Sequence, residues 1–336
     1  MRKIAVALLA IVLPLAVSPA GAQSLGSLLD GAARLEPLEA VIVARDGDIL
    51  AERGYGRHRV SDPTNIKSAS KSVISALVGI AIAKGVLAGP EQKIAPLLRD
   101  QLPASPDPRL GDVTIGHLLS MQAGLERTSG PNYGRWVSSG NWVRTALAQP
   151  FIDEPGGRML YSTGSTHLLS AILTRSTGRS TLALARDWLG AQPGFAIAGW
   201  ERDPQGIYLG GNQMAMSPRS LLAFGELFRN GGRTEAGEQI VPEDWIRQSW
   251  SLRTHSAFTG DGYGYGWFLR RMAGEEVRYA WGYGGQMLYI VPALELTVAM
   301  TSDETSPSAR TGYRDRLHGL MSAIIEAVRV GAATAG

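Results

Sequence analysis

Residues 68–85 read Ser68-Ala69-Ser70-Lys71-Ser72-Val73-Ile74-Ser75-Ala76-Leu77-Val78-Gly79-Ile80-Ala81-Ile82-Ala83-Lys84-Gly85. Apolar residues recur here at helical spacing, and the segment is apolar nearly all round. They are Val73, Ile74, Leu77, Val78, Ala81 and Ile82. Gly85 supplies a C-terminal stop. The stretch therefore predicts a helix that is buried in the centre of the domain.

Strand patterns flank this helix at both ends of the chain. Residues 40–44 and 49–54 predict a hairpin around Asp46-Gly47. Four later segments alternate or carry β-branched and aromatic residues. They are 265–270, 277–281, 286–291 and 295–301. A last amphipathic helix is expected from about 315 to 330, and segments between 113 and 232 are mostly helical in pattern.

The expected fold is therefore mixed α/β (α+β), with one antiparallel sheet built from both chain ends. Terminal helices flank this sheet, and a helical lobe is inserted into it. The sheet lobe is predicted at about 38–66 and 262–335, and the helical lobe at about 67–261. A doubly wound parallel sheet is the alternative, but the middle of the chain lacks the regular alternation of strands and helices that it needs.

The first residues have the pattern of a secretory signal peptide. A positive start is followed by an apolar run from Ile4 to Val17 and by the small residues Ala20-Gly21-Ala22. A membrane anchor is the alternative, but the apolar run is shorter than the roughly 20 residues that span a bilayer. We therefore predict a signal peptide at 1–22, a mature domain at 23–336, no membrane span after cleavage, and a periplasmic or secreted location.

Composition excludes several classes of protein. Hydrophobic residues are 44% and charged residues 19%, which is typical of a globular chain. The formal charge of +3 falls to +1 without Arg2 and Lys3, and no basic run occurs, so nucleic acid is not an expected partner. The chain has no cysteine and its five histidines are scattered, so neither a metal nor a cofactor is expected. No obligate protein partner is evident.

Lysine is scarce in this chain. Of 33 basic residues only five are lysine, and none follows Lys93. Lys71 lies three residues after Ser68, so a helix would bring the two side chains together. A buried lysine loses its charge more easily and can then activate a serine hydroxyl as a nucleophile. The spacing Ser-x-x-Lys is an acyl-transfer signature, although an N-capping serine followed by a surface lysine is the structural alternative.

Two further segments contain groups that could take part in catalysis. Tyr161, in Tyr161-Ser162-Thr163, precedes an apolar helix, and its phenol could be held as phenolate or shuttle a proton. A packing role for this tyrosine is the alternative. Residues 280–287 place glycines inside strand-like sequence, where a ligand could approach the backbone. A backbone N–H there could form an oxyanion hole with the N–H of Ser68, although a tight turn explains the same glycines.

These three segments, in this order, resemble the motifs of the class C β-lactamase-like serine hydrolases. That group includes penicillin-recognising peptidases, carboxylesterases and 6-aminohexanoate-oligomer amidases. The resemblance extends to 113–125, which is similar to the family's helix ending in Ser-Gly-Leu, and to the glycine turn at 210–219. It covers about Ala40 to Asp303, and it implies a β-lactamase/transpeptidase-like fold.

The chain departs from the family pattern at two places. Thr163 stands where the middle motif usually has Asn, and the third motif lacks its usual lysine. Trp281-Gly282-Tyr283-Gly284 instead resembles the esterase and amidase branch. Within that branch the resemblance implies an oxyanion donor at the backbone of Tyr283. Trp281, Gly282 and Gly284 would then line the substrate pocket.

The resemblance thus implies a secreted serine hydrolase that cleaves a small ester or amide. Ser68 would be the nucleophile, and Lys71 and Tyr161 the proton-transfer groups. Two alternatives stay open: a β-lactamase or D-alanyl carboxypeptidase, and a silent cell-wall-binding module on the same fold. For the first of these, an arginine at 270, 271 or 278 could replace the missing cation of the third motif.

Overall fold

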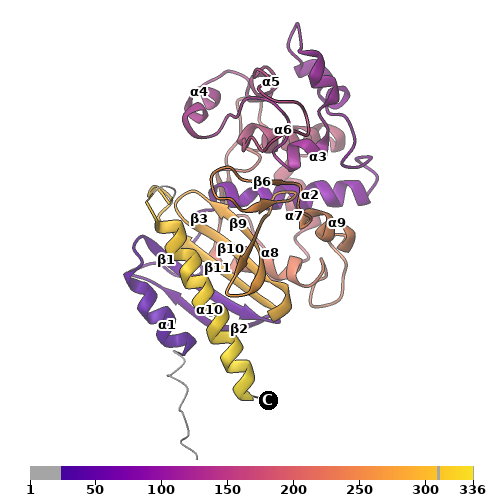
Figure 1. Ribbon diagram of the computed structural model, residues 1–336. Helices are drawn as coiled ribbons and strands as arrows, with labels where there is room; N and C mark the ends of the chain where they lie inside the picture. Colours follow the sequence, from indigo (N-terminus) through magenta and orange to yellow (C-terminus); the bar gives the residue numbers. More distant parts are fainter. Residues whose placement is uncertain (1–23, 309–310, 336) are drawn as a thin grey trace, which may run out of the picture.

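A large antiparallel sheet forms one half of the molecule in the computed structural model, which describes residues 24–308 and 311–335 (Figure 1). Its strands lie in the order β2-β1-β11-β10-β9-β8-β7-β6. The bounds are β1 Leu38–Arg45, β2 Asp48–Gly54, β6 Thr254–His255, β7 Gly262–Tyr263, β8 Phe268–Met272, β9 Glu275–Gly282, β10 Gln286–Val291 and β11 Leu296–Ser302. This confirms the expected antiparallel sheet built from both ends of the chain.

The two ends of the chain meet between β1 and β11. Val41 pairs with Met300 in an antiparallel ladder, so a strand from the first fifth of the chain lies beside one from the last. The predicted hairpin joins β1 to β2 through Asp46 and Gly47, which both have positive φ, at 48° and 87°. Asp and Gly tolerate this left-handed conformation better than most residues, which is why Asp46-Gly47 marks the turn.

Helices cover both faces of the sheet. The helix bounds are α1 Leu25–Gly31, α2 Ser70–Ala83, α3 Ile115–Leu119, α4 Tyr133–Val137, α5 Trp142–Leu147, α6 Thr163–Thr177, α7 Thr181–Trp188, α8 Pro218–Arg229, α9 Glu243–Ser249 and α10 Tyr313–Ala335. On one face α1 and α10 pack over strand residues such as Val43 and Tyr289. Residues of α2 and α8 pack against the other face, at Leu288 and Ala299. Alternation along each strand thus supplies two separate apolar layers.

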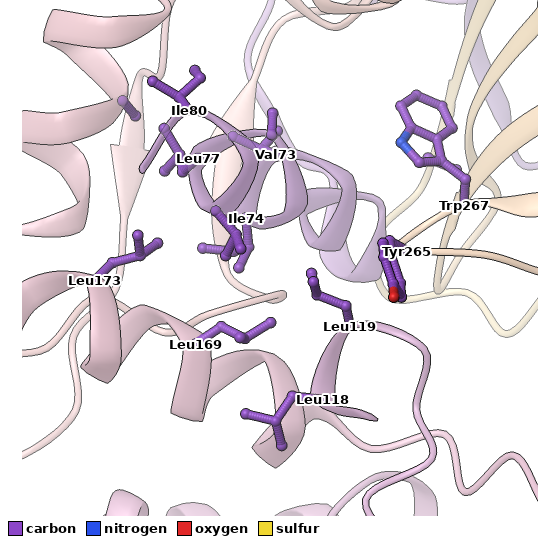
Figure 2. Close-up of a cluster of buried hydrophobic side chains, with 14 of the residues drawn as sticks. Val73, Ile74, Leu77, Ile80, Leu118, Leu119, Leu169, Leu173, Tyr265 and Trp267 are labelled. Carbon is purple, nitrogen blue, oxygen red and sulfur yellow. The ribbon is translucent and has the colours of Figure 1, made fainter. Parts of the chain in front are cut away.

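Helix α2 lies at the centre of the second layer, as its uniformly apolar sequence predicts. Figure 2 shows Ile74 of this helix facing leucines of α3 and α6, whereas Val73 points to the other side of the helix. All of them belong to the same buried cluster as Tyr265 and Trp267. Ser70 to Ala81 are all buried along the helix. A helix surrounded in this way has little freedom to shift, so the residues at its N-terminal end are held in fixed positions.

A second, three-stranded sheet has the order β3-β5-β4, with β3 Thr64–Asn65, β5 Met214–Met216 and β4 Gly199–Trp200. Strand β3 leads directly into a 3₁₀ turn, η2 (Lys67–Ala69), and then into α2. The small sheet therefore connects the segment around residue 200 to the start of the central helix.

Some elements differ from the sequence prediction. The segment 265–267 is not part of β8, because Gly264 and Gly266 interrupt the strand pattern, and Gly266 has a φ of 81°. The range predicted for the helical lobe, 67–261, also contains β6 and α8, which belong with the large sheet. The predicted signal peptide, 1–22, lies outside the described residues. Among the residues that were described, no helix has the length and apolar character needed to cross a bilayer.

Candidate active site

Ser68 lies at the entrance to α2, where the chain changes from the 3₁₀ turn η2 to the α-helix. This geometry brings Lys71 Nζ to 3.0 Å from Ser68 Oγ. Ser68 is partly exposed to solvent, whereas the Lys71 side chain is buried, with only 1% of the residue exposed. Of the two readings of Ser-x-x-Lys, the structure therefore excludes a surface lysine.

The ammonium-bearing end of Lys71 is surrounded by uncharged oxygen atoms. Nζ donates to the carbonyl oxygen of Gly211 at 2.7 Å and lies 3.3 Å from Thr163 Oγ1. It also lies 5.1 Å from the centre of the Tyr161 ring. Burial in this neutral environment disfavours the charged form and lowers the pKa of Lys71 to about 7.

A lysine with a pKa of about 7 is deprotonated in a substantial fraction of molecules at neutral pH, and this fraction can act as a base. In its neutral form it can donate two hydrogen bonds, to Gly211 and Thr163, while its lone pair faces the hydroxyl of Ser68. The Ser68 proton then has an acceptor within hydrogen-bond distance. The arrangement can thus convert a weak hydroxyl nucleophile into a reactive one.

This pKa makes a prediction about the pH dependence of activity. If Lys71 is the base, kcat/KM for an uncharged ester should rise with pH through about 7, because protonated Lys71 cannot accept the Ser68 proton. The measurement is a pH–rate profile between pH 5 and 9 with one ester in buffers of constant ionic strength. A profile that is flat across this range would exclude Lys71 as the titrating base.

Tyr161 lies beside this pair, because its ring centre is 5.1 Å from Lys71 Nζ and the Ser68 hydroxyl is close enough to influence the pKa of its phenol. Burial raises the pKa of its phenol far above the usual value, and the hydrogen bond from Ser68 offsets this only in part. The phenol is therefore neutral at pH 7, which favours a proton shuttle over a phenolate. Its ring also packs near Phe268 and Tyr263, so the functional and packing interpretations of Tyr161 are compatible.

Three residues near Lys71 were not named as site residues from the sequence. Thr163 Oγ1 lies 3.0 Å from Ser129 Oγ, and Thr163 N donates to the same Ser129 oxygen at 2.8 Å. Ser129 comes from a loop far from both Tyr161 and Lys71 in sequence, and no motif marks it. Thr163 could be identified as the departure from Asn in the middle motif, because it occupies a hydrogen-bonding position beside Lys71.

Gly211 is the third of these residues, and the structure explains why a glycine occupies this position. A Cβ at this position would lie 2.6 Å from Lys71 Cγ, and its φ is 81°. The preceding segment is anchored by a buried pair, in which His167 Nε2 lies 3.0 Å from Asp203 Oδ2. His167 Nδ1 also accepts from the N–H of Gly210 at 3.3 Å. Helix α6 thereby fixes the carbonyl that binds Lys71.

The glycine-rich segment lies close to Ser68 through its first glycine. A Cβ on Gly282 would lie 2.2 Å from the carbonyl oxygen of Ile66, so only glycine allows the end of β9 to approach the chain two residues before Ser68. The turn that follows is tight, because Gly285 N donates to Gly282 O at 3.2 Å. Gly284 has a φ of 87°. The Gly285 N–H is thus used within the turn, which leaves Tyr283 and Gly284 as candidate oxyanion donors.

The two aromatic residues of this segment differ in their surroundings: Trp281 is packed against other side chains, whereas Tyr283 is exposed to solvent. The Trp281 indole contacts Phe268 and lies under the guanidinium of Arg314, at 5.0 Å, and its Nε1 donates to Ser308 at 3.4 Å. Trp281 therefore packs at the start of α10, one ring away from Tyr161. The Tyr283 side chain is 48% exposed.

The arginines that could have replaced the missing lysine are engaged elsewhere. Arg270 pairs with Asp261 at 3.1 Å, Arg278 pairs with Glu276, and Arg271 donates to the Gly274 carbonyl. Within 24–308 and 311–335, no group of three His, Cys, Asp or Glu side chains could hold a metal ion.

The sheet, the central helix and the linked Ser68, Lys71 and Tyr161 side chains define a class, the serine hydrolases built on the β-lactamase fold. A family model described as Beta-lactamase matches residues 32–321. The chain belongs to the β-lactamase family, whose members include esterases, amidases and penicillin-binding-protein-like proteins.

Solved structures with the same fold cover most of the chain. EstCE1, a hydrolase with promiscuous acyltransferase activity, is 18% identical with a TM-score of 0.72 over 88% of this chain and 97% of that one. A penicillin-binding protein homologue from Caulobacter crescentus is 15% identical, with a TM-score of 0.69 over 90% and 96%. A D-stereospecific amidohydrolase from Streptomyces sp. is 15% identical, with a TM-score of 0.65 over 88% and 94%. At these identities the likeness shows the fold, and it confirms the β-lactamase/transpeptidase-like architecture.

A curated relative matches part of the sequence. The "Probable fimbrial assembly protein FimD, serogroup H1" of Dichelobacter nodosus is 34% identical over 140 residues. The match covers 40% of this chain and spans only about a third, 35%, of that protein's length.

Proposed function

We propose that the protein hydrolyses a small ester or amide through a covalent acyl-enzyme on Ser68. The observation that carries this proposal is the buried, uncharged environment of Lys71, whose Nζ lies 3.0 Å from Ser68 Oγ. A packing lysine would have no reason to be held neutral beside a partly exposed serine. Strongly shifted pKa values are concentrated at functional sites, which supports a catalytic role for this buried amine.

In both acylation and deacylation, the attacking hydroxyl group loses one proton and the departing group gains one. Ser68 Oγ attacks the carbonyl carbon and its proton passes to Lys71 Nζ. The leaving alcohol or amine then takes a proton from Lys71, relayed through the Tyr161 hydroxyl, as its bond to the acyl carbon breaks. Water next attacks the acyl-enzyme, gives up a proton along the same path, and releases the acid while Ser68 regains its hydrogen. Backbone N–H groups of Ser68 and Tyr283 are the proposed donors to the oxyanion.

A second prediction concerns Tyr161. We expect Tyr161→Phe to fold normally, because the ring contacts with Phe268 and Tyr263 remain, and to lose roughly 10²-fold or more in kcat. The measurement is steady-state turnover of p-nitrophenyl butyrate, with thermal melting as the check on folding. A Phe variant with normal turnover would assign Tyr161 to packing alone.

The choice of substrate class is tested by direct comparison. We expect kcat/KM for p-nitrophenyl butyrate to exceed that for nitrocefin, since β-lactam antibiotics carry a carboxylate that needs a cationic partner. The third motif offers no lysine, and Arg270, Arg271 and Arg278 already have partners. If nitrocefin is the better substrate by tenfold, about 1.4 kcal/mol of transition-state preference, the β-lactamase or D-alanyl carboxypeptidase alternative replaces this proposal.

Two further parts of the proposal, the presence of activity and export from the cytoplasm, have tests of their own. A cell-wall-binding module without activity would fail to hydrolyse any ester, and its Ser68 would not react with a fluorophosphonate. Export from the cytoplasm follows from the signal-peptide pattern of residues 1–22. Comparing the mass of the protein in periplasmic and whole-cell fractions would detect cleavage after Ala22.

A further inference from the structure

The N-terminal end of α6, beside the buried lysine of the site, is capped by a separate loop. The N-cap residue Ser162 uses its own side chain to hold that loop, because its Oγ accepts from Thr128 N at 3.0 Å. Two neighbouring hydroxyl groups of the loop cap the helix. Thr128 Oγ1 accepts from Gly164 N, and Ser129 Oγ accepts from Thr163 N, each at 2.8 Å. These two loop residues therefore share one structural task.

Ser129 and Thr128 differ in their second hydroxyl contact. Thr163 Oγ1 lies 3.0 Å from Ser129 Oγ and 3.3 Å from Lys71 Nζ. The Ser129 hydroxyl is thus linked to the buried amine through a single intervening hydroxyl group. The second contact of Thr128 Oγ1 is with Ser162 Oγ, at 3.1 Å. The two capping residues can therefore be compared as one that is linked to the base through Thr163 and one that is not.

The hydrogens and lone pairs around the amine can be assigned. The two N–H groups of neutral Lys71 meet the Gly211 carbonyl and Thr163 Oγ1. The lone pair of the amine then remains for the Ser68 hydroxyl. This assignment needs Thr163 Oγ1 as an acceptor, so the hydrogen of that hydroxyl has to point elsewhere. Ser129 Oγ can accept it, because an hydroxyl oxygen has two lone pairs and Thr163 N uses only one of them.

The opposite direction of the Thr163 hydroxyl would block the base. A hydroxyl group can donate to the lone pair of a neutral amine. With its hydrogen pointed at Nζ, Thr163 would occupy the lone pair of Lys71, and the Ser68 proton would then lack this acceptor. A competing acceptor for the Thr163 hydrogen therefore keeps the base available.

The loop that carries Ser129 is held in place on both sides of this residue. Before it, Thr128 N donates to Ser162 Oγ at 3.0 Å. After it, Asn132 Nδ2 donates to the carbonyl oxygen of Arg127 at 3.0 Å and closes the loop on itself. Ser129 itself is partly exposed, so its own hydrogen can be donated to solvent while its oxygen accepts from α6. A hydroxyl supported in this way keeps a fixed direction.

We infer that Ser129 is a positioning residue for the base: by accepting the hydroxyl hydrogen of Thr163, it keeps that oxygen an acceptor for Lys71 and leaves the amine lone pair facing the nucleophile. The inference rests on the proposed function, because this task exists only if Lys71 accepts the Ser68 proton. Ser129 and Thr163 keep their own hydrogens throughout the reaction, so the proton route through Lys71 and Tyr161 is unchanged.

A double-mutant cycle separates this task from helix capping. We expect Ser129→Ala and Thr163→Val each to lose roughly 30-fold in kcat/KM for p-nitrophenyl butyrate, and the double variant to lose about as much, rather than roughly 900-fold. The losses do not multiply because Ser129 acts through the Thr163 hydroxyl, which valine lacks. Valine keeps the backbone N–H that Ser129 caps, so a purely structural effect of Ser129→Ala would persist in the Thr163→Val protein.

Two further variants are the controls. Thr128→Ala removes the equivalent cap from Gly164 N and should lower the melting temperature at least as much as Ser129→Ala does. Its kcat/KM should nevertheless stay within about threefold of the wild type, because its hydroxyl is not linked to the amine through Thr163. Thr163→Ser keeps the hydroxyl group and should retain at least about a third of the wild-type kcat/KM.

The pH profile is a readout that capping alone would not change. In Ser129→Ala the Thr163 hydrogen turns to the amine, and a hydrogen bond to the neutral form disfavours the protonated form. The midpoint of the rise in kcat/KM, expected near pH 7 in the wild type, should therefore move to lower pH by about half a unit while the plateau falls. The titratable groups around the site are the same in both proteins: Tyr161, Lys67, Glu304, His167 and Asp203.

The outcomes separate the positioning role from the reaction itself. If the wild type hydrolyses p-nitrophenyl butyrate no faster than Ser68→Ala does, the proposed function fails and this inference fails with it. If the wild type is active but the two losses multiply, or Ser129→Ala keeps the wild-type kcat/KM, the positioning role is overturned and the Ser68 mechanism stands. Where Ser129→Ala does not fold, Thr163→Val is compared with Thr163→Ser, and equal activity of these two proteins overturns the inference.

Discussion

Replacing Ser68 by alanine is expected to reduce ester hydrolysis roughly 10⁴-fold or more. The loss follows because no covalent acyl-enzyme can form without Ser68 Oγ, and Lys71 then has no hydroxyl to activate. Turnover of p-nitrophenyl butyrate measures the effect. Mass spectrometry after fluorophosphonate treatment should show one adduct, on the peptide that contains Ser68.

Ser70→Ala provides a matched control from the same turn. Ser70 is buried and donates to the Lys67 carbonyl at 2.7 Å, so its removal costs about 1 kcal/mol of stability without touching Lys71 Nζ. This variant should retain most of the activity and should still be labelled on Ser68. An adduct on another serine, together with an active Ser68→Ala protein, would contradict the assignment.

Lys71→Arg is expected to be nearly as damaging as Lys71→Ala, with each losing roughly 10³-fold in kcat/KM. Arginine keeps the positive charge but remains protonated at every pH that the protein survives, so it cannot accept the Ser68 proton. Its larger planar head also does not fit the site where Nζ lies 2.7 Å from the Gly211 carbonyl. Steady-state kinetics on one ester compares the three proteins.

The control for charge and size is Lys71→Met, which keeps a long side chain without an amine. It should be as inactive as the arginine variant, yet melt at a temperature at least as high as the wild type, because it removes a buried polar group. Its residual activity should also lack the rise through pH 7. An arginine variant with more than a tenth of wild-type activity would make Lys71 an electrostatic or structural residue.

Local patterns were sufficient to predict most of the fold. The Asp46-Gly47 hairpin, the apolar helix after Ser68 and the late strands all depend on spacing within a few residues. Each of these elements forms, although the strand predicted at 265–270 begins only at Phe268. The Ser68–Lys71 contact is equally local, because residues three apart face the same way at a helix start. Sequence alone therefore predicted that the side chains of Ser68 and Lys71 meet.

The remaining contacts of the site depend on packing between distant segments. The Ser129 hydroxyl and the Gly211 carbonyl reach the site through loops whose courses are set by tertiary contacts, such as the His167–Asp203 pair. Likewise, the sequence could place Trp281 on a strand but could not determine which neighbours its indole would contact.

The burial of Lys71 also links proton uptake to the stability of the whole domain. Its pKa is about 7 in the folded chain, whereas an unfolded lysine titrates near 10.4. Between these two values the unfolded state binds more protons, so this residue makes the free energy of unfolding increase as the pH rises. Below pH 7 its destabilising contribution is present in full. Lys71→Met would remove this dependence. Folding therefore favours the neutral form of Lys71, which is the form that the proposed mechanism needs.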